Sequence, residues 1–337
     1  MNKEIVLNAI KRKKQDLFPS HIEFTPEMGE KIANHLGIDI LELQDTLNHY
    51  IRIGYVNDTK IEDHKNGIRF DNFGIGWDLV VTEGFFVRYY PLKNINLYNI
   101  YQFPDPNESQ LIENVKETVK KYKNKFFVIS DHSFVLWERA YCLRGFENFL
   151  FDMLENKKFA EELLDRITEY QVQLAKRYVA CGVDGGMTGD DWGQQKGLLF
   201  SPKLWRELIK PRIAKIWKVY KDAGLSVFHH TCGDVRDIIP DLIKIGLDVL
   251  NPIQPQAMPI EELSKNYSND LSFWGGLSLQ KTLTFGSVDD VQKEVENTVK
   301  ILGIKGGYII SPAHELTSDV PLENFDAMLN TIRKFSK

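Results

Sequence analysis

The second half of the chain alternates short apolar runs with amphipathic stretches, and this alternation limits the fold more than any other feature. Buried strands are predicted at residues 225–229, 247–250, 271–274 and 307–310. Stretches with helical periodicity follow them at residues 235–244, 259–266, 287–302 and 322–336. Strands that alternate with helices predict a parallel sheet with helical crossovers.

The first half of the chain completes the count of strands. Four further strands are predicted at residues 19–24, 51–56, 125–130 and 183–187, which gives eight in all. Eight βα units that close on themselves form a TIM barrel, so we expect an α/β chain whose (β/α)8 barrel occupies residues 1–337 as one domain. An open, doubly wound sheet is the alternative. No Gly-x-Gly-x-x-Gly opens a helix after the first strand, so dinucleotide binding has no support.

One segment departs from the alternation. Residues 66–92 are aromatic, β-branched and broken by glycines, which is typical of a β-hairpin insertion. We expect this insertion to shape substrate access or to form a contact in a homodimer.

Composition excludes several classes of function. The net charge is −5, without the basic excess that nucleic-acid binding requires. Three cysteines are too few for a disulfide framework. The N-terminus lacks the apolar core of a signal peptide, and no apolar run approaches the length of a membrane span. A cytoplasmic protein with no membrane or nucleic-acid partner is therefore predicted.

Metal-ligating side chains follow the fifth and eighth predicted strands. His230 and Cys232 lie two residues apart after the fifth strand, and His314 follows the eighth. The carboxyl ends of barrel strands meet on one face, so these three side chains are predicted to converge as zinc ligands and to leave one position open for water or substrate. His229 is adjacent to His230 and should point to the opposite face, either as a group that supports the ligands or as a core residue.

Carboxylates at the same strand ends are candidates for proton transfer. Asp190 and Asp191 follow the fourth strand, and Glu315 follows the eighth. We predict that they act as acids or bases, and that Asp191 or Glu315 orients a ligand imidazole or binds the metal as a fourth ligand. The structural alternative is that one aspartate caps a helix or accepts hydrogen bonds from loop amides.

Further side chains at the strand ends are candidates for binding a substrate. Phe24, Trp192 and Trp274 are predicted to form an apolar wall, although aromatic residues at strand ends also belong to cores. Asp131 follows the third strand and Gln254 the sixth, where they would supply polar contacts.

The chain resembles the uroporphyrinogen decarboxylase superfamily, well over residues 137–337 and weakly before them. The resemblance is carried by segments at residues 137–147, 189–193, 201–212, 230–233, 248–252, 273–276 and 311–321. The fold that this resemblance implies is a TIM barrel.

The resemblance also separates two branches of that superfamily. The decarboxylase branch has an arginine-rich N-terminal motif that binds the acidic side chains of a porphyrinogen, whereas the matching residues 15–24 contain no arginine here. The branch of corrinoid-dependent methyltransferases binds zinc through His-x-Cys and a later Cys. His230 and Cys232 match that pattern, and His314 occupies the position of the later Cys.

The resemblance therefore implies a zinc-dependent methyltransferase that moves a methyl group between a small substrate and a separate corrinoid protein. The substrate would be a thiol, a methyl ether or an alcohol. A decarboxylase of a tetrapyrrole or of a smaller carboxylic acid is the alternative, and a non-catalytic binding subunit is the third possibility.

Overall fold

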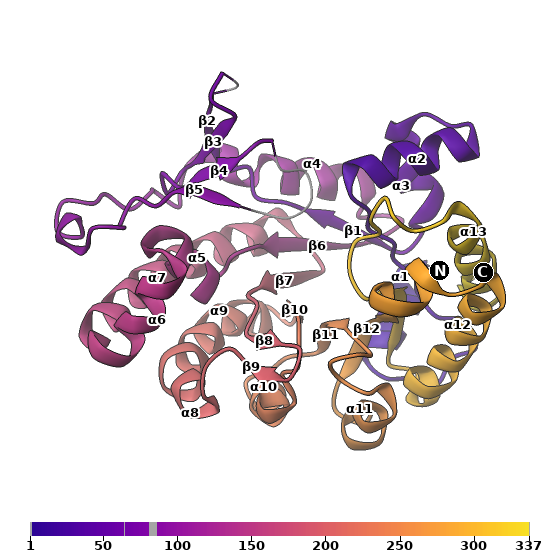
Figure 1. Ribbon diagram of the computed structural model, residues 1–337. Coiled ribbons are helices and arrows are strands. Elements are labelled where there is room, and N and C mark those ends of the chain that lie inside the picture. Colours follow the sequence, from indigo (N-terminus) through magenta and orange to yellow (C-terminus); the bar gives the residue numbers. More distant parts are fainter. Residues whose placement is uncertain (1, 64, 81–85, 337) are drawn as a thin grey trace.

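A curled parallel sheet forms the centre of the molecule (Figure 1). The computed structural model describes residues 2–63, 65–80 and 86–336. The order of the strands follows the sequence: β1 (Ile51–Gly54), β6 (Phe127–His132), β7 (Gly185–Gly189), β10 (Ser226–His230), β11 (Val249–Ile253), β12 (Ser272–Leu277) and β13 (Tyr308–Pro312). Neighbouring strands are parallel throughout, as the alternation of strands and helices predicts.

The predicted first strand is not a regular strand, which corrects that part of the sequence analysis. Residues 19–24 meet β13 through an isolated parallel bridge from Ser20 to Ile310, and they meet the segment after β13 through a second one from Phe24 to Leu316. On the other side, the Asn48 side chain accepts a hydrogen bond from the Ile22 N–H (2.7 Å) and donates one to the Ile22 carbonyl (2.9 Å). An amide side chain thus links residues 19–24 to the segment before β1. The TIM-barrel-like fold is confirmed, with this irregular segment in the eighth position.

Helices cover the outer face of the sheet (Figure 1). The crossovers and the C-terminus contain α4 (Glu113–Tyr122), α7 (Lys157–Cys181), α9 (Lys210–Asp222), α10 (Ile239–Lys244), α11 (Ile260–Tyr267), α12 (Val288–Leu302) and α13 (Leu322–Ser336). In α12, Val291, Val295 and Val299 are buried at a spacing of four residues, and Ser287 begins the helix with a capping box. Before β1 lie α2 (Pro26–Leu36) and α3 (Ile40–Leu47).

The helical stretch between β7 and β10 is interrupted. Ser201 caps a short helix, α8 (Pro202–Leu204), and a π-helical turn over Trp205–Ile209 precedes α9. Pro211 lies at the start of α9. Because proline has no N–H, it cannot continue the regular ladder of helical hydrogen bonds, and a wider turn accommodates it.

Two layers of apolar side chains hold the sheet. Inside the barrel, Phe127, Ile129, Phe228 and Trp274 pack against α1 (Asn2–Ile10), whose Val6 and Ile10 belong to the same cluster. The residues that alternate with them pack outward against the helices. In the part of the chain that the structure describes, no helix is both long and apolar enough to cross a membrane.

The predicted insertion is a β-structure, as expected, but it is larger than one hairpin. Four antiparallel strands pair in sequence order: β2 (Thr59–Asp63), β3 (Ile68–Asp71), β4 (Gly76–Asp78) and β5 (Val87–Tyr89). Asp71 accepts hydrogen bonds from the Ile75 N–H and the Trp77 indole and pairs with Arg139 of α5 (Trp137–Arg144) at 2.7 Å. The insertion is therefore fixed to the barrel through Arg139. Residues 64 and 81–85 lie outside the described residues.

Candidate active site

A cavity of about 530 Å³ opens at the carboxyl ends of the strands. In a TIM barrel this face carries the active site. The wall combines acidic, aromatic and metal-ligating side chains: Glu23, Thr25, Ile53, Tyr55, Asp131, Ser133, Phe134, Glu138, Met187, Gly189, Asp191, His230, Asn251, Pro252, Ser311, Pro312, His314, Glu315 and Thr317.

His230, Cys232 and His314 lie together at this cavity. One ligand atom from each residue lies within 4.8 Å of the other two. The Cys232 Sγ is 3.6 Å from the His230 Nε2, and the two imidazole rings meet edge to face at 5.6 Å. His230 ends β10, and His314 lies two residues beyond β13, so parallel strands bring the two segments to the same face.

Hydrogen bonds set the orientation of this cluster. The His230 Nδ1 is 2.7 Å from the Asn251 Oδ1, an acceptor, so Nδ1 carries the proton and Nε2 is left to bind a metal. The Asp191 carboxylate accepts a hydrogen bond from the Cys232 N–H at 2.8 Å. Hydrogen-bond partners of this kind fix the His230 ring and the loop of Cys232, which provide metal ligands.

Gln254 supports the cluster and does not line the cavity, which corrects its prediction as a substrate contact. Its Oε1 accepts a hydrogen bond from the Gly233 N–H at 2.6 Å. Gly233 has a φ of 81°, and a Cβ there would lie 2.4 Å from the backbone of residues 193–194. Only glycine fits such a position, so the turn after Cys232 is tightly specified.

The donor set of the cluster fits a zinc ion. Two imidazole nitrogens and one thiolate are common ligands of catalytic zinc, and three protein ligands leave a fourth position open. Without a metal, burial and the Asp191 carboxylate raise the pKa of the Cys232 thiol. A bound zinc ion would reverse this effect, because a thiol that coordinates zinc is deprotonated.

Two of the predicted carboxylates lie at the cavity, and their surroundings differ. The Asp191 Oδ1 is 3.9 Å from the His230 Nε2, close to the metal-ligand cluster. Glu315 adjoins His314, and burial followed by the nearby Glu23 carboxylate raises its pKa. Both are therefore placed to orient ligands or to exchange protons.

Asp131 also lines the cavity, beside Ser133. The Ser133 hydroxyl donates a hydrogen bond to the Asp131 carboxylate. Burial raises the pKa of Asp131 to about 6, and the Glu23 carboxylate contributes to the shift. Asp131 thus carries a negative charge at neutral pH next to a second carboxylate.

Asp190 lies behind the cavity wall, which corrects its prediction as a catalytic acid. Its carboxylate accepts hydrogen bonds from the N–H groups of Leu136 (3.4 Å), Trp137 (3.0 Å) and Glu138 (2.8 Å). The indole of Trp192 donates a fourth at 2.7 Å. The first amides of a helix need such acceptors, so Asp190 caps α5, as the structural alternative foresaw.

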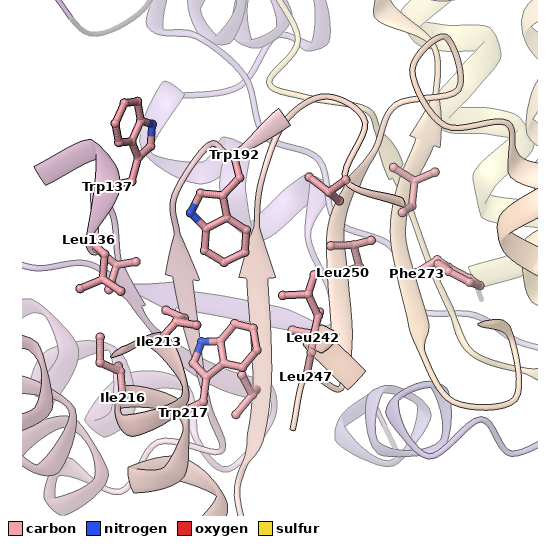
Figure 2. Close-up of a cluster of buried hydrophobic side chains, with 14 of the residues drawn as sticks. Leu136, Trp137, Trp192, Ile213, Ile216, Trp217, Leu242, Leu247, Leu250 and Phe273 are labelled. Atoms are coloured by element: carbon pink, nitrogen blue, oxygen red, sulfur yellow. The ribbon is translucent and has the colours of Figure 1, made fainter. Parts of the chain in front are cut away.

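His229 and Trp192 belong to the core. This confirms the core alternative for His229 over a role in catalysis, and it corrects the prediction of Trp192 as a substrate contact. Their rings stack at a centroid distance of 4.2 Å, and neither lines the cavity. The His229 Nδ1 is 2.8 Å from the Thr188 hydroxyl, which also accepts a hydrogen bond from the Trp217 indole. Figure 2 shows the Trp192 indole among these buried side chains, near Trp217.

Trp274 and Phe24 are also absent from the cavity wall. Trp274 points into the barrel, where its ring meets His21 edge to face at 5.2 Å. Phe24 packs against the hydrophobic core, close to Gly29 of α2. The predicted aromatic wall is therefore wrong for both residues: Trp274 belongs to the apolar cluster inside the barrel, and Phe24 packs against α2.

Among the ionisable wall residues, the sequence analysis missed Glu23, Tyr55 and Glu138. The Tyr55 hydroxyl lies 3.4 Å from the Glu23 carboxylate. Glu138 accepts a hydrogen bond from the Tyr141 hydroxyl at 3.2 Å, and burial together with Asp191 and Asp190 raises its pKa. Glu23 and Tyr55 each lie one residue before the end of the first and second predicted strands, so treating those ends like the other six would have found both. Glu138 lies on a helix and had no such signal.

The family of the chain follows from a match that spans most of its length. Residues 68–335 match the family model described as "Uroporphyrinogen decarboxylase (URO-D)". The chain belongs to the uroporphyrinogen decarboxylase family. It is 26% identical to the uroporphyrinogen decarboxylase of Rickettsia conorii over 262 residues, which are 73% of this chain and 71% of that protein.

A shorter alignment links the chain to another member of the family. It is 22% identical to the uroporphyrinogen decarboxylase of Thermus thermophilus over 209 residues, and spans only 56% of the length of that protein. Among solved structures, a methyltransferase from Methanosarcina mazei superposes with a TM-score of 0.73 at 17% identity, covering 99% of this chain and 98% of that one. This superposition shows that the two proteins share a fold.

Proposed function

We propose that this protein is a zinc-dependent methyltransferase that moves a methyl group between a small substrate and a corrinoid protein. The observation that carries the proposal is the cluster of His230, Cys232 and His314 at the edge of a large cavity. The name of the superposed Methanosarcina protein, a methyltransferase, agrees with it. The corrinoid partner comes from the resemblance of the His-x-Cys motif to that branch of the superfamily.

Zinc held by these three side chains would supply a Lewis acid that turns a thiol into a thiolate or polarises the oxygen of a methyl ether. Asn251 keeps the His230 Nε2 directed at the ligand position, and Asp191 holds the loop of Cys232. With a thiol acceptor, the sulfur forms a bond to the methyl carbon while the bonding pair of the broken bond stays on the donor. Asp191 and Glu315 are placed to take up the thiol proton.

Decarboxylation is the second candidate, because the named relatives are uroporphyrinogen decarboxylases. The composition of the cavity wall argues against a porphyrinogen with many carboxylates as the substrate. The wall contains Glu23, Asp131, Glu138, Asp191 and Glu315, and no lysine or arginine is among the described residues that line it. Binding several substrate carboxylates requires cationic groups.

Metal analysis of the purified protein tests the proposal. We expect about one zinc per chain, and a large loss of zinc in Cys232→Ser, because a hydroxyl is a much poorer zinc ligand than a thiolate. Cys181→Ser is the matched control, since Cys181 ends α7 and is half-buried. Full zinc content in Cys232→Ser contradicts the ligand assignment.

Activity assays separate the three candidates. Transfer of a methyl group from methylated cobalamin to a thiol would support the methyltransferase. Stepwise loss of carboxyl groups from uroporphyrinogen would support the decarboxylase instead. A protein that binds neither metal nor a corrinoid protein would be left with the role of a binding subunit.

A further inference from the structure

The cavity carries more negative charge than its metal ligands require. Five carboxyl groups line it, those of Glu23, Asp131, Glu138, Asp191 and Glu315. With the thiolate of a metal-bound Cys232 beside them, they outnumber the two positive charges of a zinc ion. No lysine or arginine on the described cavity wall offsets this excess.

Glu23, Asp131 and Tyr55 line the same cavity, and the Tyr55 hydroxyl is 3.4 Å from the Glu23 carboxylate. Burial and then the charges of Glu23 and Asp131 raise the pKa of Tyr55. Burial and then the Glu23 charge raise the pKa of Asp131. Carboxylates that disfavour one another's charge are stabilised by a cation placed between them.

The basic side chains that face these carboxylates do not offset the excess of negative charge in the cavity. His21 approaches Glu23 at 3.5 Å from inside the barrel, and His230 and His314 lie near Glu23 as well. The His230 and His314 imidazoles must be neutral when they bind a metal. Among the described residues that face Glu23, His21 is then the one basic side chain that binds no metal.

Aromatic side chains complete this part of the wall. Tyr55 and Phe134 both line the cavity. Aromatic faces attract cations, above all ammonium groups that carry methyl groups and are weakly hydrated. The carboxylates and the aromatic side chains thus lie on the wall of the same cavity as the His230 and His314 imidazoles.

We infer that the cavity selects a positively charged substrate: a thiol or methyl ether that also carries an ammonium group. The sulfur or oxygen would face His230, Cys232 and His314, and the ammonium group would lie among Glu23, Asp131 and Tyr55. The part of this inference that concerns the metal-ligand cluster rests on the proposed function. It also predicts that anionic thiols, such as sulfonates, are poor substrates.

Three thiols that differ in charge test the inference. Thiocholine is cationic and its quaternary nitrogen cannot bind a metal, its analogue with carbon in place of nitrogen is neutral, and mercaptoethanesulfonate is anionic. Each is titrated into the cobalt(II)-substituted protein, where a thiolate bound to the metal gives a sulfur-to-cobalt absorption band. We expect thiocholine to bind about tenfold or more tightly than the neutral analogue, and the sulfonate to bind most weakly.

Two substitutions locate the charge. In Glu23→Gln and Asp131→Asn, each nearly unchanged in shape, we expect the preference for thiocholine over its neutral analogue to fall severalfold. Glu294→Gln is the matched control, because Glu294 is a half-buried carboxyl outside the cavity. Equal affinity for all three thiols, or tightest binding of the sulfonate, would overturn the inference even if a variant fails to fold.

A second pair of ligands separates this inference from the proposed function. If none of the thiols changes the cobalt spectrum, the metal role in the proposed function is wrong. Choline and its neutral carbon analogue, titrated calorimetrically into the metal-free protein, then decide the charge selectivity. A preference of about tenfold for choline supports the inference, and equal binding refutes it.

Discussion

Asn251 and His230 are joined by a hydrogen bond of 2.7 Å between the Asn251 Oδ1 and the His230 Nδ1. The two residues end up side by side because β10 and β11 are parallel and pair in register at this point. This contact selects the His230 tautomer that offers Nε2 to a metal. Asn251 is not a predicted metal ligand itself, yet it decides whether His230 can act as a metal ligand.

Asn251→Ala should weaken zinc binding by about tenfold to a hundredfold, since the imidazole loses the partner that orients it. Competition with a chromogenic chelator measures the change. Asn251→Asp keeps an acceptor at this place and should retain most of the affinity. An unchanged zinc affinity in Asn251→Ala would show that the hydrogen bond has no influence on the metal site.

Asp190→Ala should destabilise the fold by roughly 3 kcal/mol or more, because three helix amides and the Trp192 indole lose their acceptor in a buried place. Urea unfolding followed by circular dichroism measures this. The neighbouring Asp191→Ala is the comparison: we expect a small change in stability and a clear loss of zinc affinity. If Asp191→Ala destabilises the fold as much as Asp190→Ala does, the two aspartates do not have the separate roles described here.

Asp131 should give the stability of the protein a pH dependence of defined sign. Its pKa is raised from 3.8 to about 6 by burial, so between these values the folded protein binds more protons than the unfolded chain. The free energy of unfolding that this group contributes is therefore full below pH 3.8 and is lost as the pH rises through about 6. Asp131→Asn removes the effect, which is on the order of 3 kcal/mol.

Urea unfolding of the wild type and Asp131→Asn between pH 4 and pH 7 tests this. The variant should gain stability relative to the wild type as the pH rises. A difference that is constant across this range would mean that the Asp131 carboxyl keeps an ordinary pKa.

Asn48→Ala should destabilise the barrel by about 2–4 kcal/mol, because the buried N–H and carbonyl of Ile22 lose their partner at the place where residues 19–24 meet the segment before β1. Gln44→Ala serves as the control, since it removes only the contact of 2.7 Å between the Gln44 and Asn48 side chains. Equal losses in the two variants would mean that Asn48 acts through α3 and not through Ile22. Thermal unfolding of both variants gives the comparison.

The sequence predicts the barrel and the convergence of His230, Cys232 and His314 for one physical reason. Strand and helix patterns fix the order of the βα units, and the carboxyl ends of parallel strands must share a face. Every residue close after a strand is then near that face. The same rule led to Asp131, Asp191 and Glu315, which line the cavity.

The rule does not say which way each side chain points. Asp190 and Asp191 are neighbours in the chain, yet one caps α5 and the other lines the cavity. Trp192 stacks on His229 inside the core because a ring of that size fills the space between the sheet and the helices. These outcomes depend on packing partners from distant segments, which periodicity does not encode.

The link that the Asn48 side chain makes to residues 19–24 was not predictable either. The Asn48 amide forms hydrogen bonds with the Ile22 backbone where strand-to-strand hydrogen bonds would be expected, and residues 19–24 form no regular strand. Nothing in the local pattern of either segment distinguishes this arrangement from ordinary strand pairing.

The opposite orientation of chain neighbours has a consequence for how such a protein can evolve. At residues 190–191 and 229–230, one side chain supports the core and the next serves the cavity. Deleting a single residue at either place would exchange the two roles and damage stability and chemistry at once. His314 lies beyond the end of β13, where no strand alternation fixes the direction of its side chain. New metal-binding properties are therefore most accessible by substitution at residue 314, whereas the two paired positions are held fixed by the fold.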